Sequence, residues 1–585
     1  MRNTKNFTPK RLIKAAPALL LALALAACGG SGSAAQPTPA ATEQPAAAAE
    51  IAESGGQLLV YLPMNVGSYD PLLAGTKELQ GLLSLVYEPL LQYDSTCRLS
   101  ASLAETWSTD DSGVTWKIGL RRSVRRQGSG DVFTARDVLY TVGLLRSEAY
   151  ADSVYAPLLD KIADITAVDE YTLVVTGAEP GMSVLHALTF PIVSEKNFTR
   201  NAGAGPYVIE YADEAEGMEL SVNSNWWKKP PYITTVIAQC APDVESALSL
   251  MEIRQMNYVP TSLLTASTYR EEGVTSLLET NTQHSEILYL NHASWRLQDV
   301  RVRQAIAYAL DRRDIISKAY YNHAFACDVP VPPDSWLYDS ASKIYDTDVA
   351  KARDLLEDAG WADYDEDGVL DKREGDSISR MRLTLLVNDT PDNQVRKDVA
   401  ALIKARLALV GIEVEINAVS WTAQSNDYQK ALEAGGFDMA LAGVNLDRSF
   451  DLTPFVGTGG SKNYGKYSSS AMDALLAQAR TVSSESGLKE IMAQVQQKFV
   501  EDLPFIHLYF RTYSIAYSSD LRITSDIRDT NPYQSIEKWY FTAAGRNIFS
   551  GNEFEGEHTT PPPLIVTPVQ TPGEEGEPGE TGGEE

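Results

Sequence analysis

The stretch ALIKARLALVGIEVEI, residues 401–416, decides the fold class of this chain. Its first part has the composition of a helix that ends in the apolar run 407–410, and Gly411 follows, where helices commonly close in the left-handed conformation. From 412 to 416, apolar and charged residues alternate with the period of two that a half-buried strand requires. A helix followed directly by a strand is an α/β unit, and we therefore expect an α/β fold.

Strand and helix patterns are intermixed elsewhere in the chain. The run 58–62 and the alternating segment 114–120 predict strands, and Thr134-Ala135-Arg136-Asp137 is a capping box that opens a helix. Amphipathic patterns typical of helices cover residues 298–320, 348–359, 421–434, 470–482 and 485–502.

Composition sets the size and the class of the protein. The chain has 585 residues, of which 44% are apolar, and a prior of roughly 150 residues per domain suggests about three or four globular units. The formal charge of −28 argues against nucleic acid and anionic membranes as partners, because both require clustered Lys and Arg. The Glu-, Pro- and Gly-rich segment 550–585 is expected to be a disordered acidic tail.

The N-terminus has the pattern of an exported protein. Basic residues precede the apolar run 15–27, which is too short to span a bilayer but suits a signal peptide, expected over 1–27. Leu25-Ala26-Ala27-Cys28 resembles the bacterial lipobox, so Cys28 is the expected lipidation site; an ordinary secretory signal is the alternative. Residues 28–55 have the composition of a flexible linker.

Three cysteines follow Cys28, and they allow at most one disulfide. Cys97, Cys240 and Cys327 lack the close spacing of metal knuckles, and whether any two of them pair is left open by the sequence.

Several motifs occur in the order of a known family. They are Ser68-Tyr69-Asp70-Pro71, Val86-Tyr87-Glu88-Pro89-Leu90, Gly203-Ala204-Gly205-Pro206-Tyr207 and DVRVRQAIAYALDR at 299–312. The last is nearly the signature helix of the extracellular solute-binding proteins of bacterial import systems, family 5, in the oligopeptide, dipeptide and nickel class. The chain resembles this family from about Gly56 to Arg546.

The resemblance implies a two-lobed, periplasmic-binding-protein-like clamshell of type II, with an extra subdomain in the first lobe. The expected division is 56–92, 203–282 and 509–549 for lobe I, 93–202 for its subdomain and 283–508 for lobe II. A solute would bind in the cleft between the lobes, and hinge closure would convert binding into a shape that a permease recognises.

The resemblance also implies the ligand-binding residues. An acid that binds the free amino group of a peptide is expected at Asp451, and a slip in register would move this role to Asp447. The other residues expected to line the cleft, with packing as the alternative for each, are Trp421, Asn463, Tyr464 and Tyr467.

An acidic loop at 363–374 fits the twelve-residue calcium loop. The ligands it would supply are Asp363, Asp365, Asp367, Val369 through its carbonyl, and Glu374. The upstream flank 349–356 looks helical, but 381–387 reads as a strand, so the paired helices of an EF-hand are not expected. Structural calcium and a plain surface turn both stay open, and no other cofactor is expected.

These observations favour a lipid-anchored, extracytoplasmic, monomeric solute-binding protein that captures short peptides and delivers them to the permease subunits of an ABC importer. The six histidines lack metal-ligand spacing, which argues against nickel as the solute, and the common catalytic motifs are missing from the sequence. The alternatives are a peptide sensor or cell-surface adhesin on the same scaffold, and an exported enzyme.

Overall fold

The computed structural model describes residues 51–551, apart from 128–129, 197–202, 214, 391–393 and 423–424, and without the side chain of Glu374. Cys28, the expected signal peptide 1–27, most of the expected linker and most of the expected tail lie outside the described residues. Residues 51–551 belong to one compact unit.

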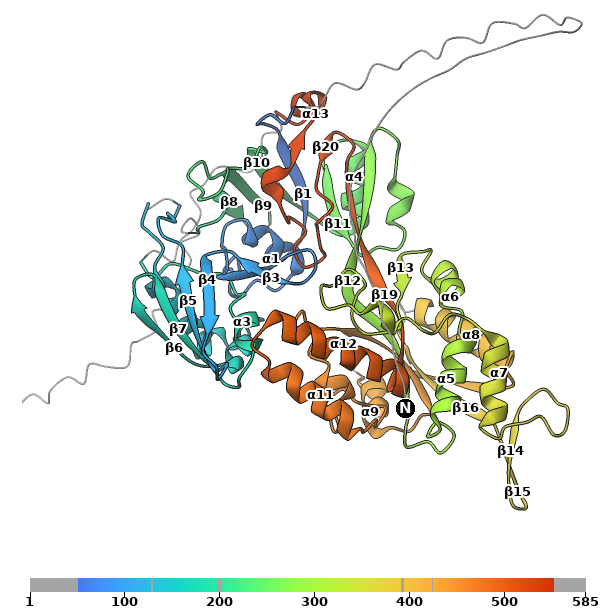
Figure 1. Cartoon of the computed structure of the whole chain (residues 1–585). Coiled ribbons are helices and arrows are strands. Elements are labelled where there is room, and N and C mark those ends of the chain that lie inside the picture. The colour runs from blue at the N-terminus through green and yellow to red at the C-terminus, as the bar shows by residue number, and fades with distance from the viewer. Residues whose placement is uncertain are drawn as a thin grey trace, which may run out of the picture. The chain divides into compact units, whose positions relative to one another are not determined.

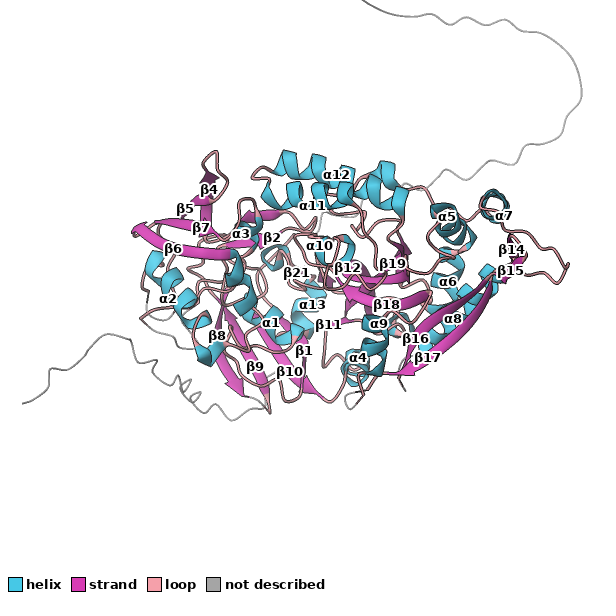
Figure 2. Ribbon diagram, turned by 90° about the horizontal axis from the view of Figure 1, so that it is seen from below, coloured by secondary structure: helices cyan, strands magenta, loops and turns pink. Residues whose placement is uncertain are grey.

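A mixed sheet of eleven strands organises this unit (Figures 1 and 2). Its order is β17-β16-β18-β12-β19-β11-β1-β10-β9-β8, with β13 paired to β19. The strands are β1 Gln57–Pro63, β8 Tyr207–Asp213, β9 Gly217–Val222, β10 Thr235–Ala241, β11 Tyr258–Thr261, β12 Thr275–Leu290, β13 Ala324–Ala326, β16 Arg382–Asp389, β17 Glu413–Ser420, β18 Met439–Asn445 and β19 Phe505–Ser518.

Two long strands, β12 and β19, connect the two ends of this sheet. The first part of β12 pairs with the end of β19 next to β11, whereas its last part, 285–290, pairs with both β18 and the start of β19. The register of the β12–β19 pair shifts between Asn281 and Ser285. A bulge at this point bends the strands and increases their twist. The expected division of the chain into lobes stays a prediction.

A separate four-stranded antiparallel sheet, β4-β5-β7-β6, lies within the segment expected to form the subdomain. Its strands are β4 Ala104–Thr109, β5 Thr115–Leu120, β6 Ile162–Asp169 and β7 Thr172–Gly177. Three two-stranded sheets complete the β structure: β2 Leu91–Tyr93 with β3 Leu99–Ala101, β14 Asp371–Glu374 with β15 Ser377–Arg380, and β20 Leu521–Arg522 with β21 Tyr540–Phe541.

Helices pack around these sheets; α11 and α12 lie together, and α8 lies along β16 and β17 (Figures 1 and 2). The α-helices are α1 Lys77–Ser84, α2 Ala135–Leu145, α3 Ser183–His186, α4 Val244–Glu252, α5 Val300–Ala309, α6 Arg312–Ala319, α7 Val349–Asp358, α8 Gln394–Ala408, α9 Asp427–Ala434, α10 Thr453–Val456, α11 Ser470–Thr481, α12 Glu485–Asp502 and α13 Ala543–Ile548. Short 3₁₀ helices cover Glu148–Tyr150, Ala156–Lys161, Ala266–Tyr269, Ser340–Ser342 and Ile536–Lys538.

Local signals in the sequence are confirmed. Gly411 has a φ of 78° between α8 and β17, so the predicted α/β unit is present. The capping box also forms, since Thr134 N donates to Asp137 Oδ2 over 2.8 Å at the start of α2.

Two helix predictions are wrong in extent. The pattern at 298–320 forms two helices, because Leu310 is extended and Asp311 caps a new helix by accepting from Asp314 N over 3.0 Å. The pattern at 421–434 becomes helical only from Asp427. Trp421 therefore lies in the loop after β17 and not at the start of a helix.

No helix among the described residues is long and apolar enough to cross a membrane.

The three described cysteines are free thiols with separate surroundings. Cys97 accepts a hydrogen bond from Gln283, whereas Cys327 is buried near Val331 O. We therefore expect no disulfide within the body of the protein.

Candidate functional site

A cavity of about 500 Å³ lies where several distant parts of the chain meet. This main cavity has the size of a small-molecule site, about 300–1,000 Å³. Most of its lining comes from segments 71–97, 154–161, 186–191, 281–283, 446–448 and 528–537. These include α1 and β2, the bulge of β12 and the loop after β18, so the cavity exists only in the folded chain.

Asp447 and Arg448 bring charge to this cavity from the loop after β18. Asp447 Oδ1 accepts from Ser449 N over 2.7 Å, which holds the turn. Desolvation acts to raise the pKa of Asp447, but the Ser449 hydrogen bond and the charge of Lys161 outweigh it, so the pKa is lowered. Asp447 is therefore a carboxylate at neutral pH.

Tyr93 and His186 form a hydrogen-bonded pair on the cavity wall. Tyr93 Oη lies 2.7 Å from His186 Nδ1, and the two rings are 5.6 Å apart. Burial lowers the pKa of His186 to about 4. The imidazole is therefore neutral at pH 7 and acts here as a hydrogen-bonding group and not as a charge.

Glu88 is a second acid of the cavity, and it is almost fully buried. Its Oε2 accepts from Trp227 Nε1 over 2.6 Å. Burial raises the pKa of Glu88 to about 7, against the opposing effects of the Trp227 hydrogen bond and the charge of Lys228. Glu88 can therefore change its charge near neutral pH.

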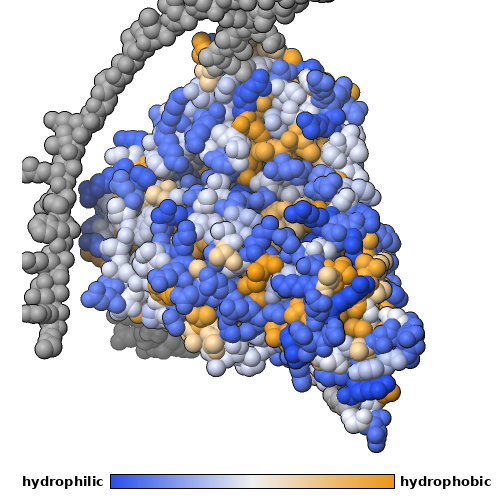
Figure 3. Space-filling view, turned by 45° about the vertical axis from the view of Figure 1, so that its right-hand side comes forward, coloured by the Kyte–Doolittle hydropathy of each residue, from blue (hydrophilic) through white to orange (hydrophobic). Residues whose placement is uncertain are grey.

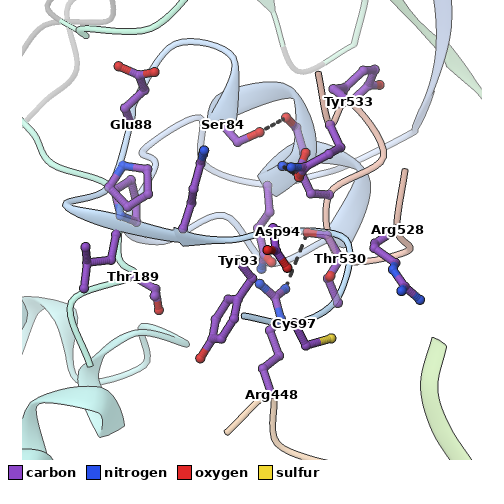
Figure 4. A pocket seen from close by; sticks show the side chains of 18 of the residues that line it. Ser84, Glu88, Tyr93, Asp94, Cys97, Thr189, Arg448, Arg528, Thr530 and Tyr533 are labelled. Carbon is purple, nitrogen blue, oxygen red and sulfur yellow. Dashed lines mark hydrogen bonds between the residues drawn. The ribbon is translucent and has the colours of Figure 1, made fainter. Parts of the chain in front are cut away.

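Two arginines line the cavity, and they differ in the interactions that their side chains make. Arg528 forms an ion pair with Asp334 at 2.6 Å and also donates to Ser95 O, so its guanidinium is occupied. Figure 4 shows the side chain of Arg448 reaching between Tyr93 and Thr530, whereas the side chain of Arg528 points away from Arg448.

Asp451 does not line the main cavity. It lines an adjoining cavity of about 240 Å³, between α3 and the helices α11 and α12. Its Oδ1 accepts from Thr453 N over 2.9 Å at the start of α10. The two cavities share Lys161 and His186.

The other expected ligand-binding residues lie outside the linings of both cavities. Asn463 is buried, and its amide donates to Gly457 O and Tyr467 O over 2.9 and 2.7 Å. Tyr464 packs on Tyr289, with ring centroids 5.5 Å apart. Tyr467 bonds to Asp502, and Trp421 is 42% exposed beside Tyr428. As ligand contacts, these four stay predictions.

The acidic loop at 363–374 brings three of its expected calcium ligands together. Carboxylate oxygens of Asp363, Asp365 and Asp367 lie within 4.8 Å of one another on the surface. Asp363 also accepts from the backbone of 367 and 368, and Asp367 pairs with Arg380 at 2.6 Å. Val369 N donates to Asp367 Oδ1, and Glu374 pairs with Ser377 at the turn of the β14–β15 hairpin. A calcium ion here stays a prediction.

Sequence reasoning missed Tyr93, His186, Glu88 and Arg448 as cavity residues. Only Glu88 belongs to one of the family-like motifs, Val86-Tyr87-Glu88-Pro89-Leu90. The others come from unrelated segments, and the pairing that joins Tyr93 to His186 spans 93 residues.

The fold and the cavity together define a mixed α/β protein that can enclose a small solute. Residues 98–466, more than half of the chain, match the family described as bacterial extracellular solute-binding proteins, family 5 Middle. The chain belongs to this family of extracellular solute-binding proteins. It is a family of transport components and not of enzymes, as predicted.

Individual relatives differ in what they bind. The oligopeptide-binding protein AppA of Bacillus subtilis is 26% identical over 89% of this chain and 97% of its own length. Heme-binding protein A of Haemophilus influenzae is 22% identical over 83% of this chain and 91% of its own length.

Solved structures share the fold. AppA from Bacillus subtilis in complex with a nonapeptide matches with a TM-score of 0.58 and 22% identity, over 84% of this chain and all of that one. The unliganded open form of MppA, a periplasmic murein tripeptide binding protein, matches with a TM-score of 0.74 and 18% identity, over 84% of this chain and 98% of that one. The predicted two-lobed binding-protein fold is confirmed.

Proposed function

We propose that this protein captures short peptides in the main cavity and delivers them to the permease of an ABC importer, held at the membrane by a lipid on Cys28. The observation that carries the proposal is Asp447, a carboxylate on the wall of a cavity of about 500 Å³. A carboxylate on the wall of a cavity is suited to the ammonium group at the start of a peptide. The similarity to AppA of Bacillus subtilis, an oligopeptide-binding protein, supports the same class of solute.

We assign the amino-group role to Asp447 in place of Asp451. Asp447 lines the main cavity, beside groups that hydrogen-bond and carry charge, whereas Asp451 lies just before α10 and lines the cavity of about 240 Å³.

The test is calorimetry with peptides that have a free or an acetylated N-terminus. Replacing Asp447 with Asn should weaken binding of the free peptide by a few kcal/mol, roughly ten- to several-hundredfold, because the ammonium loses its charged partner. The acetylated peptide should bind the parent poorly and show a smaller difference. Asp451→Asn, a matched change four residues on, should leave both affinities unchanged.

The outcomes separate the alternatives. A loss with Asp451→Asn and none with Asp447→Asn would move the amino-group site to the smaller cavity. Mass spectrometry of whatever is released from the purified, denatured protein identifies the solute independently, and a recovered metal chelate or porphyrin would contradict the peptide proposal.

A further inference from the structure

Arg448 is a cation of the main cavity that lacks an acidic partner. Its side chain is half-buried, and its Nη2 donates to Thr530 O over 3.5 Å, the long limit of a hydrogen bond. Among the described residues, no carboxylate oxygen lies within the 4.0 Å ion-pair distance of its guanidinium. A guanidinium has five donors, so most of the hydrogen-bonding capacity of Arg448 is unused by the described residues.

The surroundings of Arg448 hold it in place without neutralising it. Its guanidinium carbon lies 5.1 Å from the centre of the Tyr93 ring, within the range of a cation–π contact. Burial raises the pKa of Tyr93 and Tyr155, and the charge of Arg448 is the largest effect that opposes this in each. Both tyrosines line the cavity, so the positive charge acts on the space that a solute would fill.

Several other charged groups of the cavity have partners. Arg528 is paired with Asp334, and Asp529 with Lys77. Asp94 accepts from the backbone N–H groups of Thr96 and Arg98. Arg448 therefore differs from Arg528, the other arginine of the cavity, in a chain that carries a net charge of −28 and offers many acids.

We propose that Arg448 is the anion-binding residue of the main cavity and that the solute presents a carboxylate to it. This inference rests on the proposed function and names the class of peptide. Asp447 and Arg448 are adjacent in the chain and line the same cavity, so the preferred peptide has a carboxylate near its ammonium group. Arginine binds carboxylates through two parallel hydrogen bonds, which gives orientation as well as affinity.

The carboxylate can belong to the C-terminus of a very short peptide or to an acidic side chain. Calorimetry with three peptides distinguishes these sources: Ala-Ala-Ala, its C-terminal amide, and Ala-Asp-Ala amide. If the C-terminus is the source, the parent binds Ala-Ala-Ala about tenfold or more tightly than its amide. If the side chain is the source, Ala-Asp-Ala amide binds better than the neutral amide by a similar factor.

Arg448→Gln should abolish whichever preference the parent shows, so that the peptides with and without the carboxylate bind the variant with similar affinity. Arg448→Lys keeps the charge but not the planar fork, and it should keep part of the preference. Arg373→Gln is the matched control, because Arg373 also lies over a tyrosine, Tyr364 at 3.9 Å, but on the β14–β15 hairpin. Thermal unfolding of each variant reports on folding.

Three results would overturn the inference. They are a parent without preference for either carboxylate, an Arg448→Gln variant with the preference of the parent, and a loss that Arg373→Gln reproduces. If the parent binds these peptides but Arg448→Gln changes nothing, only the role of Arg448 fails. If the parent binds no peptide at all, the proposed function fails and this inference fails with it.

Discussion

Glu88 shows how burial sets the chemistry of a single residue. It is 6% exposed, hydrogen-bonded to Trp227, and its pKa is raised to about 7 from an ordinary value of 4.5, first by desolvation. The folded chain therefore binds a proton more readily than the unfolded chain between these two pH values. The contribution of Glu88 to the free energy of unfolding is therefore complete at low pH and is lost as pH rises from about 4.5 to 7.

We predict that Glu88→Gln removes this part of the pH dependence. A shift of this size corresponds to at most about 3 kcal/mol between pH 4.5 and pH 8. Urea unfolding of the parent and the variant at pH 5 and pH 8 measures the difference: the variant should gain stability relative to the parent at pH 8. Glu357→Gln on the exposed face of α7 is the control, and an equal pH dependence of the parent and the Glu88 variant would contradict the prediction.

At the scale of elements, a buried ion pair joins β12 to α8. Arg396 donates to both carboxylate oxygens of Glu286, over 2.9 and 3.2 Å, and Glu286 is 2% exposed. Desolvation would raise the pKa of Glu286, but Arg396 and His284 outweigh it and lower the pKa to about 2. This contribution to stability is complete above about pH 4.5 and is lost as pH falls toward 2.

We predict that Arg396→Met lowers the free energy of unfolding by about 3–5 kcal/mol at pH 7, because it leaves a buried carboxylate unpaired. Chemical denaturation measures this value, and adding Glu286→Gln should restore part of it.

Lys397→Met is the matched control on the same helix. Lys397 pairs with Asp389 at 2.6 Å, but both side chains are more than a third exposed, and such pairs contribute about 0–1 kcal/mol. A loss as large as that of Arg396→Met would show that substitution on α8, and not the buried charge, is responsible.

At the scale of the whole molecule, the polarity of the surface is the relevant feature. The face in Figure 3 is mainly hydrophilic, with separate hydrophobic patches between the charged groups, in keeping with a net charge of −28. We attribute membrane association, as part of the proposed function, to a lipid on Cys28 and not to the folded body.

We predict that Cys28→Ser abolishes lipid labelling and releases or misprocesses the protein in its native host. A single acyl chain binds membranes weakly, so stable anchoring needs the two or more chains that a modified N-terminal cysteine carries. Labelling with palmitate and membrane fractionation measure the effect, with Cys240→Ser as the control. A serine variant that stays labelled and membrane-bound would exclude Cys28 as the anchor.

Much of the local structure could be predicted, because its causes are local. The capping box at Thr134 and the left-handed Gly411 act over a few residues, and both form as expected. The helix at 298–320 was overextended because periodicity does not reveal that Asp311 caps a second helix.

The candidate site was predicted only in part. The loop after β18 was identified, and Asp447 within it lines the main cavity, but the preferred Asp451 faces the smaller one. For Asn463, nothing in its sequence neighbours shows that its amide donates to Gly457 O and Tyr467 O, and its role as a ligand contact stays a prediction.

The sequence by itself determined the α/β class, most element positions and the family, since propensity, capping and ordered motifs are properties of neighbouring residues. Only the tertiary structure decided which charges are left without partners. Arg528 and Arg448 look alike in sequence, yet one meets Asp334 and the other meets only the Tyr93 ring and Thr530 O among the described residues. The physical reason is that an ion pair depends on distances of a few ångströms between residues far apart in the chain, and only the packed sheet brings them together.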